Sequence, residues 1–102
     1  MIRITVSGTR LTLEGHANSD GYGHDLVCAA VSALTLTLAK NVKRLTRQGL
    51  AEDAVIQLQP GYGLICCRPK NKEAVKAVYA AIVTGYRLLG ENYPQFVRVR
   101  IL

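Results

Sequence analysis

The sequence contains few of the residues that stabilise small secreted or metal-binding domains. It has three cysteines in 102 residues, and two of them, Cys66 and Cys67, are adjacent. Neighbouring cysteines rarely pair with each other, and neither a Cys-x-x-Cys motif nor a Cys/His spacing typical of zinc is present. An odd number of thiols without a disulfide framework is typical of a reducing compartment. We therefore expect a cytoplasmic protein that holds no metal.

Long hydrophobic runs are also missing. Apolar stretches are interrupted by Thr, Ser, Lys or Gly well short of the ~20 residues that a membrane-spanning helix needs. Residues 1–6 alternate in polarity like a strand and lack the basic region, apolar block and cleavage site of a signal peptide. The sequence therefore predicts a soluble chain that does not enter a membrane. Its length and average apolar content predict one domain over residues 1–102.

Acidic residues are scarce relative to basic ones. Seven acidic residues stand against thirteen basic ones, which gives a formal charge of +6. Such a surplus favours anionic partners, RNA above all, but does not bear on the fold. Much of it lies at one predicted helix end, where cations interact favourably with the helix dipole: Lys40, Lys43, Arg44 and Arg47. A solvated helix end explains these residues, so the charge permits RNA contact without requiring it.

Alternation of apolar and polar residues predicts five strands, because successive strand residues point to opposite faces of a sheet. They are expected at residues 2–7, 10–14, 55–59, 64–68 and 97–101. The first four strands pair as two hairpins, the second of which turns at Pro60–Gly63.

Steps of three and four between apolar residues predict two helices. The first is expected from Asp25, as its N-cap, to Gln48, and the second from about Lys72 to Leu89, with Gly90 as its stop. Residues 26–33 are apolar nearly all round, which predicts a central, buried helix. The order ββαββαβ predicts a single α+β domain, with a mainly antiparallel sheet and two helices packed on one face.

Reactive residue types gather around the start of the first predicted helix. With Asp25 as N-cap, Cys28 falls at the third helical position, beside backbone N–H groups without an intrahelical partner. Helix N-termini favour the thiolate, which is the nucleophilic form of cysteine. The negative charge of Asp25 opposes a thiolate, so a nearby imidazolium is needed to favour it.

His16 can supply that imidazolium. It ends the second predicted strand, so it can meet Cys28 at one edge of the sheet, and a Cys–His pair is the usual form of an activated thiol. Ser32, one turn after Cys28, lies on the same helix face and can donate to the sulfur or fill a core gap. His24 is a second candidate base. Each residue also has a structural explanation, because a cysteine on an apolar helix is usually a small buried hydrophobe.

From Gly15 to Gly23 the sequence is rich in turn formers, which predicts a flexible loop. We expect the loop over residues 17–23 to order on substrate binding. Gly21 and Gly23 can absorb the dihedral changes of closure, and Tyr22 can cover a bound peptide. A plain connection without a gating role is the alternative.

The string Gly15-His16-Ala17, followed after a short loop by Gly23-x-Asp25-Leu26-Val27-Cys28-Ala29-Ala30-Val31-Ser32-x-Leu34, resembles the signature of the ribosomal-processing cysteine proteases called Prp. In length and element order the resemblance covers the whole chain, and its specific part is residues 15–34. It implies a nucleophile at Cys28, a histidine at His16, the motif aspartate at Asp25 and the motif serine at Ser32. Cys66 and Cys67 match no part of the signature.

The resemblance implies a cysteine endopeptidase, homodimeric and free of cofactors. Its expected substrate is the precursor of a large-subunit ribosomal protein, from which it removes an N-terminal extension through an acyl-enzyme. A non-enzymatic RNA- or ribosome-binding module is the main alternative, supported by the net charge and by five basic residues but by no RNA-binding motif. These residues are Lys70, Lys72, Lys76, Arg98 and Arg100. An interaction subunit in which Cys28 is merely packed is the third possibility.

Overall fold

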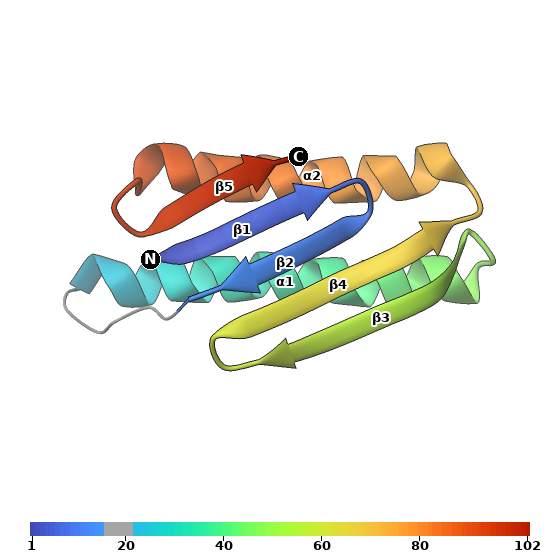
Figure 1. Ribbon diagram of the computed structural model, residues 1–102, viewed down its shortest axis with the longest axis horizontal. Helices are drawn as coiled ribbons and strands as arrows, with labels where there is room; N and C mark the ends of the chain where they lie inside the picture. The colour runs from blue at the N-terminus through green and yellow to red at the C-terminus, as the bar shows by residue number, and fades with distance from the viewer. Residues whose placement is uncertain (16–21) are drawn as a thin grey trace.

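A computed structural model describes residues 1–15 and 22–102, with the backbone alone at positions 22–25. The elements are β1 (Ile2–Ser7), β2 (Arg10–Glu14), α1 (Tyr22–Arg47), β3 (Ala51–Gln59), β4 (Tyr62–Pro69), α2 (Lys72–Asn92) and β5 (Val97–Ile101). The strands form one sheet in the order β3-β4-β2-β1-β5. All neighbours are antiparallel except β1 and β5, which are parallel. Both helices cover the same face of the sheet and run in opposite directions (Figure 1). The predicted element order and α+β class are confirmed.

The apolar and polar residues that alternate along each predicted strand lie on opposite faces of the sheet. On β1, Ile2, Ile4 and Val6 are buried under the helices, whereas Arg3 and Ser7 are exposed. The strand register aligns the buried residues, which form one continuous core with the inner sides of α1 and α2. Burying each large apolar side chain contributes about 1.5–3 kcal/mol, so this layer is the main source of stability.

Helix α1 begins earlier than predicted. Its first residue is Tyr22, so Tyr22 and Gly23 are helical, and Asp25 lies within the first turn and is not the N-cap. The prediction placed the start at the first good capping side chain, but a helical glycine at position 23 costs only about 1 kcal/mol. Within the predicted loop, residues 16–21 lie outside the described residues.

The prediction that the first half of α1 is buried all round is also wrong. Leu26 is 60% exposed, and Ala29 and Ala33 are also exposed, because α1 packs on the sheet with one side only. The predicted end is confirmed. Gly49 takes a φ of 74°, and the N–H of Leu50 donates to the carbonyl of Leu45 at 2.9 Å.

Helix α2 begins as predicted and ends later. The side chain of Asn71 caps its start by accepting from the N–H of Ala74 at 3.0 Å. The helix continues through Gly90, so this glycine is not the stop. At the end of the helix the N–H of Tyr93 donates to the carbonyl of Leu89 at 2.7 Å. Gly90 packs against β5 and does not take a left-handed conformation.

Within α1, the segment Leu26–Arg47 is long and apolar enough to cross a bilayer by length and composition alone. Its inner residues Val31, Leu38 and Val42 pack into the core, and the core helices of soluble proteins meet the same criterion. That the chain does not enter a membrane stays a prediction.

Candidate active site

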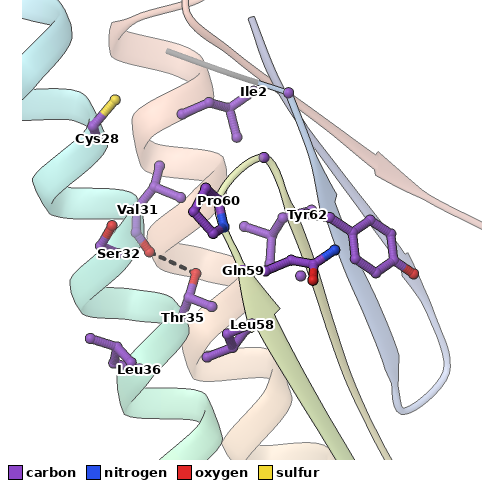
Figure 2. Close-up of a pocket in the computed structure, with 14 residues that line it drawn as sticks. Ile2, Cys28, Val31, Ser32, Thr35, Leu36, Leu58, Gln59, Pro60 and Tyr62 are labelled. Carbon is purple, nitrogen blue, oxygen red and sulfur yellow. Dashed lines mark hydrogen bonds between the residues drawn. The ribbon is translucent and has the colours of Figure 1, made fainter.

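A pocket of about 500 Å³ opens between α1 and the turn that joins β3 to β4 (Figure 2). Its lining is mostly apolar. Helix α1 contributes Cys28, Val31, Ser32, Thr35 and Leu36. The strands and turns contribute Ile2, Leu13, Gly15, Leu58, Gln59, Pro60, Gly61, Tyr62 and Gly63. Residues from both predicted hairpins and the first predicted helix therefore meet at one place.

Gly63 forms part of the pocket floor. It lies in the sheet between Leu13 of β2 and Leu58 of β3, on the side that faces the helices. A Cβ at this position would lie 3.0 Å from Cδ1 of Leu13 and 3.2 Å from Cδ2 of Leu58. Any larger residue would therefore displace a leucine and change the pocket.

Cys28 lies on the α1 wall of this pocket. It is half-buried, and Figure 2 shows its sulfur pointing from the helix toward the end of the pocket near Ile2. Because α1 begins at Tyr22, Cys28 is the seventh helical residue and not the third as predicted. Among the described residues, the N–H groups without an intrahelical partner belong to residues 22–24, and the dipole effect fades beyond the first turn. The helix start alone therefore does not activate this thiol, and the need for a neighbouring base is greater than the sequence indicated.

Ser32 and Thr35 continue the same wall of α1. Ser32 lines the pocket one turn after Cys28, on the face where the sequence placed it. The Thr35 hydroxyl donates to the carbonyl of Val31 at 2.7 Å and lies 2.6 Å from the Tyr86 hydroxyl. Because the single hydroxyl proton of Thr35 is donated to the carbonyl of Val31, the Tyr86 hydroxyl is the donor to the Thr35 oxygen. Tyr86 is fully buried, and burial raises its pKa to about 12.

The end of β2 brings the chain to the mouth of the pocket. Gly15 lines the pocket, and its N–H donates to the carbonyl of Gly61 at 3.1 Å. It has a φ of 111°, and a Cβ there would overlap the carbonyl oxygen of Met1, so glycine is required. His16, the next residue in the chain, lies outside the described residues.

The remaining predicted site residues are placed only in part. Tyr22, Gly23, His24 and Asp25 have described backbone in the first turn of α1, and Gly21 lies outside the described residues. Thr35, Gly63 and the β3–β4 turn were not predicted to belong to the site. The spacing of positions 28, 32 and 35 on one helix face was a signal for Thr35. The turn itself was predicted, but it approaches α1 only in the folded chain, so its place in the site could not be.

The other two cysteines lie away from the pocket. Cys67 is buried, with its sulfur 3.7 Å from the Tyr79 hydroxyl, and burial raises the pKa of the Cys67 thiol. Burial likewise raises the pKa of Tyr79. Cys66 is half-buried and opposes Arg10 and Val55 across the sheet. Among the described residues, no group of three His, Cys, Asp or Glu side chains could hold a metal ion.

Comparison with known protein families shows the family to which this chain belongs. The family model described as Cysteine protease Prp matches residues 1–98. The chain belongs to the Prp family of cysteine proteases. The resemblance seen in the sequence is therefore confirmed, and the chain is a cysteine peptidase. The non-enzymatic alternative is wrong.

Individual relatives agree with the assignment. The ribosomal processing cysteine protease Prp of Mycoplasma pneumoniae is 32% identical over 97 residues, which cover 95% of this chain and 91% of the relative. The crystal structure of SMU.848 from Streptococcus mutans has a TM-score of 0.81 at 32% identity, covering 100% of this chain and 97% of the other. An essential ribosomal processing protease Prp from S. aureus, in complex with a substrate peptide, has a TM-score of 0.78 at 21% identity, with 100% of each chain covered. At that identity the S. aureus structure supports the shared fold.

Proposed function

We propose that this Prp-family peptidase removes the N-terminal extension of a large-subunit ribosomal protein, with Cys28 as nucleophile and His16 as base and acid. One observation carries the residue assignment. Cys28 and Gly15, the residue before His16, line the same pocket although thirteen positions separate them in the chain. The processing role is supported by the name of the Mycoplasma pneumoniae relative.

The proposed reaction proceeds through an acyl-enzyme. His16 takes the proton of the Cys28 thiol, and the sulfur attacks the scissile carbonyl carbon. The C–N bond then breaks, and His16 returns its proton to the leaving amine. His16 next deprotonates a water molecule that attacks the thioester, which frees the new C-terminus and the thiol. The Ser32 hydroxyl, on the same wall, is a donor for the sulfur or for the substrate carbonyl. No cofactor takes part.

The apolar lining of the pocket indicates what it binds. Val31, Leu36 and Leu58 lie beyond Cys28 along the pocket, and burying an apolar side chain against them is favourable. We therefore assign to this pocket an apolar side chain of the substrate next to the scissile bond.

The function is tested with the ribosomal protein precursor and purified enzyme, by sequencing the new N-terminus of the product. The wild type should cut once, within the extension junction, and His16→Ala should not cut. His24→Ala is the matched control and should retain cleavage. The rate should depend on a group that titrates near neutrality. Loss of cleavage in His24→Ala with activity retained in His16→Ala would show that the wrong histidine was assigned.

We also propose that the chain acts as a homodimer through the outer side of α1. Small and apolar residues form an exposed stripe there at helical spacing: Leu26, Ala29 and Ala33. Such a stripe is suited to a self-complementary interface between two copies. Light scattering at micromolar concentration should give a dimer, and Leu26→Asp should give a monomer. Leu88→Asp, which changes an exposed leucine of α2, should stay dimeric. A monomeric wild type would refute the proposal.

A further inference from the structure

Besides Arg68, which is paired with Glu52 and Asp53, the face of the sheet that the helices leave uncovered carries four exposed arginines. Arg3 of β1 and Arg98 of β5 are direct partners across the parallel strand pair. Arg100 is the partner of Thr5, two residues further along the same strands, and Arg10 of β2 is the partner of Ser7. All four alternate with residues that face the helices, so they share the open side. We call Arg3, Arg10, Arg98 and Arg100 the arginine face.

The charge of the arginine face is largely uncompensated. Glu14, the partner of Arg3 on β2, is the acidic residue that the strand register places among these arginines. The ion pairs formed within the described part of the sheet join Arg68 to Glu52 and to Asp53, each at 2.9 Å. Like charges directly opposite each other on a sheet are destabilising, as at Arg3 and Arg98. A bound polyanion would relieve this repulsion.

We propose that the arginine face binds the phosphate backbone of double-stranded RNA. Arginine presents a planar fork of donors that binds phosphate through two hydrogen bonds, and all four basic residues of the face are arginines. The hydroxyls of Thr5, Ser7 and Thr12 lie between them in the strand register and can donate to further phosphate oxygens.

The composition of the face favours a duplex over a single strand. Single-stranded RNA is usually held by bases stacked on several aromatic side chains. On this face the described strands carry one aromatic residue, Tyr62, which lies toward the β3–β4 turn, away from β5. Contacts to phosphates therefore dominate, and binding should depend little on base sequence. The arginine face points away from α1, so RNA here and a peptide at Cys28 can be bound together.

The test is fluorescence anisotropy with a labelled 20-base-pair RNA hairpin at several salt concentrations. The triple variant Arg3→Gln/Arg98→Gln/Arg100→Gln should bind at least about tenfold more weakly than the wild type near 0.1 M salt. The slope of log Kd against log salt should fall by about 2–3, roughly one for each phosphate contact removed. Arg100→Gln alone, near the end of the edge strand, should lower the slope by about 1.

A control triple variant removes the same charge from another surface. Lys72→Gln/Lys76→Gln/Arg87→Gln changes exposed residues of α2 and should alter the affinity by less than about threefold. Both triple variants should keep the wild-type unfolding temperature and the cleavage rate of a short peptide, because neither touches the pocket.

Four results would overturn the proposal. The first is a wild type that does not bind the hairpin at micromolar concentration. The second is an equal loss of binding in both triple variants, which would mean that net charge alone is responsible. The third is binding of anionic lipid vesicles or poly-glutamate as tight as that of RNA and lost in the same variant, which would make the face a general anion surface. A wild-type dimer that becomes a monomer in the sheet variant would show that the face joins two copies of the chain.

Discussion

Strand β4 has two ends that differ in how the helix-facing position is filled. At one end Gly63 has no side chain, and the pocket lies above it against the α1 wall that carries Cys28. At the other end Cys67 fills the same kind of position and packs against the hydroxyl of Tyr79, under α2. Gly63, Ile65 and Cys67 take alternate positions along this strand, on its helix-facing side. The difference between an open site and a closed core is therefore made by single residues at these two positions.

The thiols of Cys28 and Cys67 also differ in how accessible they are. Cys28 is half-buried on the wall of an open pocket, whereas Cys67 is 7% exposed and has a raised pKa. A thiol must reach its substrate and become a thiolate to act as a nucleophile. Burial opposes both conditions at Cys67, so position in the fold, more than residue type, decides which cysteine can react.

Substitution of Cys28 and of Cys67 should have very different effects. Cys28→Ala should lower the turnover of a peptide substrate by at least about a thousandfold, because it removes the nucleophile. Cys67→Ala should keep turnover within about threefold of the wild type and lower the free energy of unfolding by about 1–2 kcal/mol, through a small cavity and a lost contact to Tyr79. Steady-state kinetics and urea unfolding check the two predictions. Turnover that survives in Cys28→Ala and is lost in a folded Cys67→Ala would reverse the assignment.

The second effect concerns Tyr86, on the core side of the pocket wall. Its pKa is raised from 10.0 to about 12, so the folded state keeps a phenol proton that the unfolded chain releases near pH 10. The contribution of Tyr86 to the free energy of unfolding is therefore fully present below pH 10. It is lost as the pH rises toward 12, by about 2–3 kcal/mol in all. Urea unfolding from pH 9 to 12 should show this fall in the wild type and a shallower one in Tyr86→Phe. Parallel curves for the two proteins would contradict it.

A side chain at Gly63 should have a smaller effect, on substrate binding. Gly63→Ala should push Leu13 or Leu58 toward the pocket and raise KM for a peptide about tenfold, with kcat nearly unchanged. Gly90→Ala is a matched control, because a Cβ there meets neighbours at an ordinary 3.7 Å. Kinetics in which both variants behave like the wild type would mean that the substrate does not use this pocket.

The last effect, on stability alone, concerns Thr35, which belongs to both regions. It lines the pocket, but its hydroxyl is bonded to Val31 and Tyr86 in the core. Thr35→Val should destabilise the fold by about 2 kcal/mol, because the buried Tyr86 hydroxyl loses its partner. Tyr86→Phe removes the donor and leaves Thr35 bonded to Val31, so its cost below pH 9 should be about 1 kcal/mol. Equal losses in the two variants would show that the donor was assigned wrongly.

The sequence was sufficient for the elements and for much of the site, because both depend on local patterns. Alternation and helical spacing located all seven elements, and the spacing of Cys28 and Ser32 placed both on one helix face. The start of α1 was missed, since Asp25 is a good capping residue that the chain does not use as one. Contributions of Gly63 and the β3–β4 turn were missed because they depend on contacts between residues far apart in the chain, which no local pattern records. The exposed side of α1 was missed because an apolar residue type does not reveal what covers it.

The central claim is that Cys28 is the nucleophile of this peptidase, and covalent trapping tests it most directly. The enzyme is treated with a substrate-derived peptide that carries a thiol-reactive vinyl sulfone at the scissile position, and the adduct is mapped by mass spectrometry. We predict one adduct per chain, on Cys28, formed in step with the loss of activity and much more slowly in His16→Ala. An adduct on Cys66 or Cys67 that accompanies inactivation while Cys28 stays unmodified would contradict the account.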